Sequence, residues 1–334
     1  MITLGHFQRA YSILRTEGPR SLLSHTKGFV RRSSKGPRAI RVAVKNGNYA
    51  GAIGIFTQIL TNRNIYVWYV KRHSADNTAT RCIDGFTMHL NLDDQGLSSD
   101  LLCQGIREQY STEVYKQELS RLAGLQNKVT ILEVGANIGY YALMAANELG
   151  DKADIRAFEP SPINIEYLSK NVGENEFENQ IEVLPLAISD KPGTIEFQLA
   201  EKANQNRIKR DHIKSPDYDV VDTVDVEMTT LDNYLAENGI APQHIDVVRM
   251  DVQGSEVDVF EGMQSILESN HSMVVFLETH PSMLSDGAHA NLIQELQSSN
   301  FELVNATKTY KDLDIVSLDD ERVLERDMEL ILRR

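Results

Sequence analysis

The chain of 334 residues is long enough for one large domain or two modest ones. Its 41% hydrophobic content, with scattered glycine and proline, fits a globular protein and excludes a disordered or fibrous one. The two cysteines, Cys82 and Cys103, form no CxxC pair and no Cys/His cluster. This excludes a disulfide framework and a cysteine-based zinc site, and it fits a reducing compartment.

Charge is distributed unevenly along the chain. The net charge is -14, yet residues 1–45 carry +9, so residues 46–334 carry -23. A body this acidic repels nucleic acid, and we therefore expect no nucleic-acid partner. The same surplus of carboxylates would also fit a salt adaptation.

The first 38 residues are basic and weakly amphipathic. Apolar positions between Phe7 and Val30 have helical spacing on either side of Gly18-Pro19, and residues 31–38 form a basic linker. Two hypotheses are open: the segment binds peripherally to an anionic membrane or to a partner, or its helices pack on the main domain. The opening residues lack the apolar stretch of a secretory signal, so we expect a cytoplasmic protein. If residues 1–38 bind a membrane, the protein would be membrane-peripheral.

Residues 39–128 form an N-terminal extension of strands and helices that we expect to pack on the core. The segment Ile65–Val70 is rich in β-branched and aromatic residues, which predicts a strand. The segment Thr87–Leu92 alternates strictly between apolar and polar residues and predicts a second, half-buried strand.

From residue 129 to the end, apolar runs and helical patterns alternate. Several of the runs are continuously apolar, as in strands whose sheet is covered on both faces. The pattern predicts a doubly wound α/β domain over residues 129–334. Its strands are expected at 129–134, 154–158, 180–184, 245–250, 273–278, 301–304 and 328–332, and its helices at 138–148, 162–171, 230–237, 255–268 and 288–298.

A glycine turn follows the first of these strands, with an acid two residues before it. A dinucleotide-binding turn needs G-x-G-x-x-G, but Asn137 and Tyr140 stand at the second and third glycine positions. The pattern Glu133-x-Gly135-x-x-x-Gly139 instead suits S-adenosylmethionine. The ammonium group of this cofactor would donate a hydrogen bond to Glu133, directly or through water. Gly135 would let the backbone approach the ligand, and a turn shaped only by packing is the alternative.

The second strand ends in a carboxylate, Glu159, which lies 24 residues after Gly135. A carboxylate at this point can accept both ribose hydroxyls of an adenosine-bearing cofactor. Ser161 and Pro162 then suit the cap and first position of a helix. The alternative for Glu159 is a surface carboxylate beside a helix N-terminus.

Two further strands end in side chains that can carry chemistry. Asp251 follows strand 245–250 and is expected beside the transferred methyl group as base, substrate clamp or ligand-orienting acid, unless it only caps the next helix. Glu278 and His280 follow strand 273–278 and could act as general bases. We assign catalysis to these three residues and no metal to the protein, although the three could alternatively hold a divalent cation.

Four blocks of this chain resemble those of FkbM-family methyltransferases: Glu133–Tyr141, Ala157–Pro160, Ala187–Asp190 and Met250–Glu256. The resemblance extends over about residues 85–305. It implies a class I, Rossmann-like methyltransferase fold and transfer of a methyl group from S-adenosylmethionine to an oxygen, often on a sugar or polyketide. The chain departs from the family pattern with Gln253 and Ser255 in place of Glu and Ala, and with Glu133 in place of Asp.

The resemblance also implies which residues bind the cofactor and what the acceptor is. Ser189 would contact the adenine, although a plain turn is an equal alternative. The acceptor would be a small molecule or glycan. Residues 199–223 and 281–290 lack a strong core pattern, so from the residues themselves we expect these segments to select the acceptor, with 203–212 as a lid or a solvated loop. A nicotinamide-dependent oxidoreductase and a non-catalytic scaffold are the rival functions. The cofactor-binding set is Glu133, Gly135, Asn137, Gly139, Glu159 and Ser189.

Overall fold

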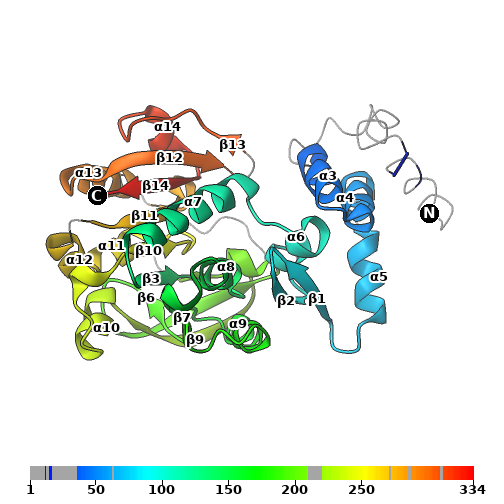
Figure 1. Ribbon diagram of the computed structural model, residues 1–334, viewed down its shortest axis with the longest axis horizontal. Helices are drawn as coiled ribbons and strands as arrows, with labels where there is room; N and C mark the ends of the chain where they lie inside the picture. The colour runs from blue at the N-terminus through cyan, green and yellow to red at the C-terminus, as the bar shows by residue number, and fades with distance from the viewer. Residues whose placement is uncertain are drawn as a thin grey trace. The chain divides into compact units, whose positions relative to one another are not determined.

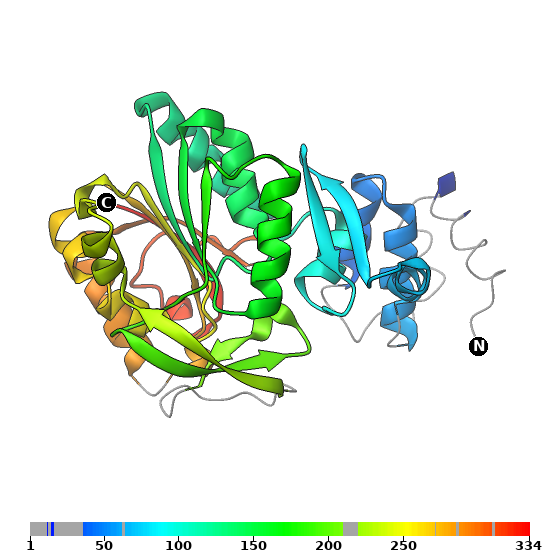
Figure 2. The same ribbon diagram turned by 90° about the horizontal axis from the view of Figure 1, so that it is seen from below.

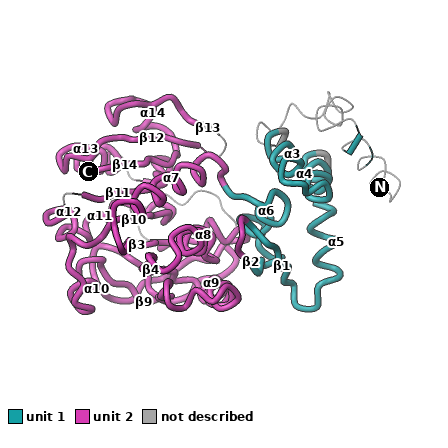
Figure 3. The backbone as a smooth tube through the Cα atoms, viewed as in Figure 1, with its two compact units in different colours: residues 1–83, 87–107 teal, residues 84–86, 108–334 magenta. Residues whose placement is uncertain are grey.

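The computed structural model describes residues 36–61, 64–209, 220–270, 272–284, 287–308 and 311–334, together with Ser12, Arg15 and Thr16. The chain divides into two compact units, residues 1–83 with 87–107, and residues 84–86 with 108–334 (Figure 3). Apart from Ser12, Arg15 and Thr16, the helices expected between residues 7 and 30 lie outside the described residues, as does most of the expected linker.

Unit 1 combines helices with one β-hairpin. Its elements are α3 (Gly36–Lys45), α4 (Tyr49–Thr61), α5 (Ile65–His73), β1 (Thr78–Ile83), β2 (Phe86–Asn91) and α6 (Leu97–Gln104). Strand β2 confirms the strand expected from the alternation at Thr87–Leu92. No helix within the described part of the chain is both long and apolar enough to cross a bilayer.

The prediction of a strand at Ile65–Val70 is wrong, because this segment belongs to helix α5. The Asn64 side chain accepts a hydrogen bond from the Val67 backbone N–H at 3.1 Å and so caps the helix N-terminus. At the other end, a run of basic residues that includes Lys71 suits the negative end of the helix dipole. These end effects outweigh the β-propensity of the aromatic and branched residues between them.

Unit 2 is built on an eight-stranded sheet with the order β13–β12–β14–β11–β10–β3–β4–β5 (Figure 1). Strands β5, β4, β3, β10 and β11 are parallel, and β14 runs antiparallel between β11 and β12. This is the class I methyltransferase arrangement that the sequence predicts. The strands are β3 (Val129–Val134), β4 (Ala153–Phe158), β5 (Ile181–Leu184), β10 (Val247–Met250), β11 (Val274–Thr279), β12 (Glu302–Lys308), β13 (Lys311–Asp312) and β14 (Met328–Arg333).

Helices cover both faces of this sheet (Figure 2). On one face Leu132 and Val248 belong to an apolar core shared with α10 to α13. On the other face Phe276 packs edge-on against Tyr115 of α7, which the structure places in unit 2 and the sequence analysis had placed in the extension. The main helices are α7 (Gln109–Leu125), α8 (Tyr140–Leu149), α9 (Pro162–Glu174), α10 (Leu231–Glu237), α11 (Glu256–Glu261), α12 (Gln264–Ser269), α13 (Ala288–Ser298) and α14 (Glu321–Glu325).

The single helix expected over 255–268 is in fact two short ones, α11 and α12, separated at Gly262. A Cβ atom at Gly262 would lie 2.1 Å from the backbone oxygen of Ser189. The chain therefore breaks the helix where another segment passes against its backbone.

A second sheet follows β5, and most of its strands are not among those expected from the sequence. It has the order β6–β9–β7–β8 and comprises β6 (Ala187–Ile188), β7 (Gly193–Ala200), β8 (Arg207–Ile208) and β9 (Val220–Thr229). Phe197, Ile208 and Val226 form part of its small apolar core. Within the stretch 199–223, which we expected to select the acceptor, residues 199–200, 207–208 and 220–223 are strand.

Candidate active site

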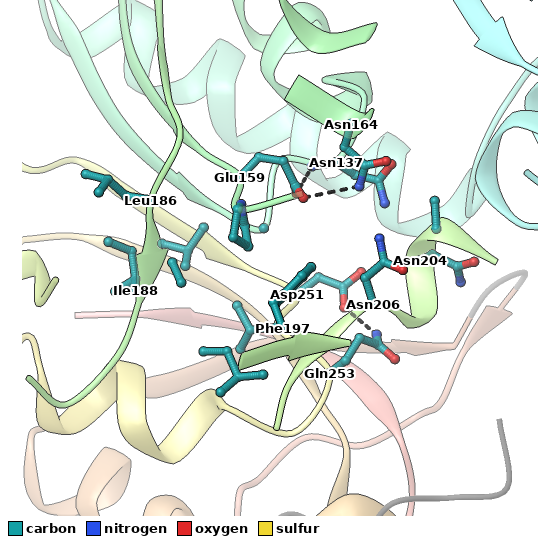
Figure 4. Close-up of a pocket in the computed structure, with 17 residues that line it drawn as sticks. Asn137, Glu159, Asn164, Leu186, Ile188, Phe197, Asn204, Asn206, Asp251 and Gln253 are labelled. Carbon is teal, nitrogen blue, oxygen red and sulfur yellow. Dashed lines mark hydrogen bonds between the residues drawn. The ribbon is translucent and has the colours of Figure 1, made fainter. Parts of the chain in front are cut away.

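A pocket lies at the carboxyl ends of β3, β4 and β10, next to the point where the strand order reverses (Figure 4). It encloses about 550 Å³ of space, part of it open to solvent. Glu159 lines it from β4 and Asp251 lines it from β10. Doubly wound sheets bind ligands at this position.

Gly135, in the turn after β3, has a φ of +82°, a conformation that residues other than glycine rarely adopt. A Cβ atom there would lie only 2.3 Å from the backbone oxygen of Asp251. The backbone N–H groups of Gly135 and Ala136 both donate to the Phe158 carbonyl at 2.9 Å. Gly135 lines the pocket, and it also lets the β3 turn pack directly on the exit of β10.

The same turn contains two more residues with positive φ, Asn137 at +52° and Gly139 at +92°. Asn137 lines the pocket, and its side-chain Oδ1 accepts from the Ile138 N–H at 2.9 Å. Gly139 does not line it; a Cβ atom there would lie 2.5 Å from the side chains of Leu143 and Leu168. Gly139 therefore serves helix packing, whereas Asn137 faces the ligand space.

Glu159 is held by three hydrogen bonds within unit 2. Its Oε2 accepts from the Asn137 backbone N–H at 2.8 Å, and its Oε1 accepts from the Ser161 N–H at 2.9 Å and from Asn164 Nδ2 at 3.2 Å. Burial raises the pKa of Glu159 to about 7, and these hydrogen bonds oppose that rise. The carboxylate is fixed in the pocket and still has lone pairs for ribose hydroxyls.

Glu133 is 1% exposed and is not among the residues that line the pocket. Its Oε1 accepts from Arg249 Nη1 at 2.7 Å, and the Arg249 guanidinium lies 3.6 Å from the centre of the Tyr141 ring. Its Oε2 has no hydrogen-bond partner among the described residues. Burial raises the pKa of Glu133 to about 7, against the lowering effect of Arg249. Arg249, which the sequence analysis did not consider, is thus the direct partner of Glu133.

The wall beyond Glu159 is apolar. Ser189 is fully buried and does not line the pocket; its backbone N–H donates to the Thr229 carbonyl at 2.9 Å. The residues just before it line the pocket instead, so the expected block contributes through other positions. The apolar side chains of this wall are Leu186, Ala187, Ile188, Phe197 and Ile208.

Of the three expected catalytic residues, Asp251 is among the described residues that line the pocket, whereas Glu278 and His280 are not. Its Oδ1 accepts from Gln253 Nε2 at 2.7 Å. Burial by itself raises the pKa of Asp251, but the charges of His280 and Arg249, with hydrogen bonds from Glu278 and Gln253, lower it overall. Asp251 is therefore ionised.

Glu278 has the opposite character. Burial, followed by the charge of Asp251, raises its pKa well above the usual range. One proton therefore stays between the two carboxyl groups, with Glu278 donating to Asp251. The pair behaves as a single acid–base unit at the edge of the pocket.

His280 is buried, and its Nδ1 lies 2.7 Å from Glu256 Oε1. Its Nε2 lies 3.0 Å from Gln253 Nε2 and 3.7 Å from Glu278 Oε1. Burial by itself lowers the pKa of His280, but Glu256 and then Glu278 and Asp251 raise it to about 10. The imidazole is therefore charged near neutral pH and in that state has no lone pair to accept a proton.

The polar residues that sequence reasoning missed come mainly from three places: the helix after Glu159, the turn after β10, and the segment before β8. Asn164 holds Glu159, and Gln253 joins Asp251 to His280. Asn204 lines the pocket, and its buried Oδ1 has no hydrogen-bond partner among the described residues. It belongs to the expected lid segment 203–212, whose last three residues lie outside the described part of the chain. Only its polarity in an acidic body signalled it.

Known proteins with related sequences carry out methyl transfer. A 2-O-methyltransferase, NoeI, from Sinorhizobium fredii is 29% identical over 175 residues, which cover 49% of this chain and 69% of NoeI. The hexuronic acid methyltransferase AglP from Haloferax volcanii is 27% identical over 184 residues, which cover 55% of this chain and 67% of AglP. The methyltransferase sdnD from Sordaria araneosa is 25% identical over 173 residues, which cover 45% of this chain and 66% of sdnD.

The chain thus spans about two thirds of the length of each of these relatives. The family model for the methyltransferase FkbM domain matches residues 133–303, from the acid of the glycine turn to strand β12. The matched region contains all nine residues to which the sequence analysis gave a site role. The chain belongs to the FkbM methyltransferase family.

Proposed function

We propose that the protein transfers a methyl group from S-adenosylmethionine to a hydroxyl oxygen of a sugar, a glycan or a glycosylated metabolite. One observation carries the proposal: the hydrogen-bonded Glu159 and the ionised Asp251 line the same pocket, one on β4 and one on β10. The first suits the ribose of the donor, and the second suits a hydroxyl that must lose a proton.

The donor would lie along the pocket with its adenosine end at Glu159. Ribose hydroxyls would donate to Glu159, and the adenine would contact the apolar wall that contains Ile188 and Phe197. The methionine end would lie against the Gly135 turn, with Glu133 reached only through water, since it does not line the pocket. A sulfonium is positively charged, and the ionised Asp251 favours it electrostatically.

The chemistry asked of the protein is alignment and proton removal. The acceptor oxygen attacks the methyl carbon, the carbon–sulfur bond breaks, and sulfur keeps the electron pair as a neutral thioether. The hydroxyl proton passes to the Asp251–Glu278 pair. Holding the two reactants in line is worth roughly 7–11 kcal/mol of the barrier, and a positioned base adds about two to four orders of magnitude in rate.

The acceptor class rests on two kinds of support. Two relatives are described as a 2-O-methyltransferase and a hexuronic acid methyltransferase. The Asn204 amide also leaves a buried oxygen at the pocket that a hydroxyl or amine could satisfy. Neither rival function gains support: the glycine turn carries Asn137 and Tyr140 where a nicotinamide site needs glycine, and the pocket keeps both acids.

Calorimetric titration with S-adenosylhomocysteine and with NADH tests the donor. We expect binding of the first and none of the second; the reverse result would overturn the proposal. Labelled S-adenosylmethionine with a panel of neutral sugars, hexuronic acids and amines then tests the acceptor. Label transfer to the hydroxyl compounds is expected, whereas donor binding without transfer to any of them would favour the non-catalytic scaffold.

A further inference from the structure

Three side chains of different chemistry converge where β10 and β11 end. Asp251, Glu278 and His280 each offer one ligand atom, and these atoms all lie within 4.8 Å of one another. Bonds of about 2.0–2.6 Å to a divalent cation place its ligands roughly 3–5 Å apart. Small side-chain movements, together with loss of the protons on Glu278 and His280, would therefore bring all three atoms onto one ion.

Glu256 supplies a second observation, which comes from outside this cluster. Glu256 is fully buried, and its Oε1 lies 2.7 Å from His280 Nδ1. A carboxylate on one imidazole nitrogen orients the ring and leaves the other nitrogen for a metal, the usual arrangement of metal-binding histidines. His280 Nε2 in turn lies 3.7 Å from Glu278 Oε1, with no hydrogen bond between them, on the side of the ring away from Glu256.

Gln253 provides a third observation. Its Nε2 lies 2.7 Å from Asp251 Oδ1 and 3.0 Å from His280 Nε2, so an amide nitrogen faces a ring nitrogen. The two ends of a glutamine amide exchange places by a half-turn. After that turn its oxygen would occupy the same place, between two of the three ligand atoms. Gln253 is thus a candidate fourth oxygen donor.

We propose that Asp251, Glu278 and His280 bind one divalent cation of the Mn²⁺ type at the edge of the pocket. Two carboxylates with one imidazole make a mixed oxygen and nitrogen set, which Mn²⁺ accepts and which Ca²⁺, an all-oxygen ion, does not favour. Asp251 lines the pocket, and the Glu278 side chain is 23% exposed, so the cation is reachable.

The cation also defines the acceptor, and this step rests on the proposed function. Three protein ligands leave open positions on a six-coordinate ion. Two neighbouring oxygens of one molecule, as in a vicinal diol or a hydroxyl beside a carboxylate, would fill two of them. The acceptor class is therefore one with paired oxygens, held beside the methyl group of the donor.

Binding is tested first, by titrating the full chain with Mn²⁺ and following the electron paramagnetic resonance signal of the free ion. We expect one site per chain, and a pulsed spectrum that shows nitrogen coupling from a coordinated histidine. His280→Gln should weaken Mn²⁺ binding at least tenfold and remove that coupling, whereas the exposed control His244→Gln should change neither. Glu278→Gln, a more exposed position, gives a second variant if the first fails to fold.

S-adenosylhomocysteine binding separates the two proposals. If the chain binds this compound but no Mn²⁺, or if His280→Gln binds Mn²⁺ as the unmodified chain does, the cation site is wrong while the proposed function stands. If Mn²⁺ binds but S-adenosylhomocysteine does not, the proposed function fails and the cation site stands. The acceptor class is checked by turnover with a chelator present: transfer to a vicinal diol should be lost, and undiminished transfer would overturn it.

Discussion

The two sides of the pocket treat their carboxylates differently. On β4, Glu159 accepts hydrogen bonds from two backbone N–H groups and one amide, all supplied by residues close to it in the fold. On β10 and β11, Asp251 and Glu278 share a proton beside the charged His280. Under the proposals above, the first side would bind neutral hydroxyls, and the second would take up a proton or bind a cation.

The difference follows from what each carboxylate has to face. Backbone N–H groups are fixed dipoles, so Glu159 can be held in place without another charge nearby. Two acids at one edge cannot both ionise without compensation, so Asp251 and Glu278 depend on protons or cations that can move. We therefore expect changes on the first side to act on donor affinity and changes on the second to act on turnover.

The largest expected effect is on turnover. Asp251→Asn removes the ionised carboxylate and should lower kcat by about 10²–10⁴-fold, with little change in S-adenosylhomocysteine affinity. Radiolabel transfer and calorimetry measure the two quantities. The exposed Glu268→Gln is the matched control. An Asp251→Asn enzyme with normal kcat would remove Asp251 from catalysis.

A smaller loss is expected on the other side. Glu159→Ala removes the hydrogen bonding between the ribose hydroxyls and a carboxylate, worth about 1.5–3 kcal/mol in total. S-adenosylhomocysteine affinity should fall by roughly 10- to 150-fold, as measured by calorimetry. If affinity is unchanged while turnover falls, the contrast between the two sides is wrong.

Gly135 joins the two sides, and a matched pair of glycines tests its role. Gly135 and Gly239 both have positive φ, but a Cβ atom at Gly239 meets nothing within 4 Å, whereas one at Gly135 meets Asp251. Both alanine variants carry the cost of the left-handed backbone. Gly135→Ala should lose about 1–3 kcal/mol more in the free energy of unfolding, measured with urea. Equal losses would show that the β3 turn can move away from β10.

The pH dependence of donor binding gives the smallest effect. The pKa of Glu159 is raised to about 7, so the acceptor form is lost as pH falls through that value. Affinity for S-adenosylhomocysteine should fall by up to about tenfold as the pH is lowered from 8 to 6. This change corresponds to about 1.4 kcal/mol of binding free energy. Calorimetry at both pH values, with Glu159→Gln as the pH-insensitive control, checks it; an equal slope in that variant would assign the effect to another group.

The site was predictable where its residues follow strands directly. Gly135, Glu159 and Asp251 each stand at or just after a strand end, and strand ends of a parallel sheet meet at one edge, so local pattern places them together. Ser189 and Gly139 have the right spacing but turn out to contact other parts of the chain. A pattern gives the position of a residue along the backbone and leaves the direction of its side chain open.

Charge states were beyond local pattern. The pKa of His280 depends on Glu256, 24 residues away, and the state of Glu133 depends on Arg249, 116 residues away. A solvated histidine would titrate near neutral pH, but burial beside several carboxylates moves it to about 10. Partners of this kind are defined by register between strands and helices.

The sequence by itself determined the alternating strands and helices, the glycine turn and the acids that follow the strands, because hydrophobic period and turn chemistry are local properties. Only the tertiary structure decided that 220–229 adds a strand to a second sheet and that Glu133 faces Arg249. It also brought Asp251, Glu278 and His280 within 4.8 Å. Pairing across the sheet and burial act between distant residues, and they set both the contacts and the charges of the site.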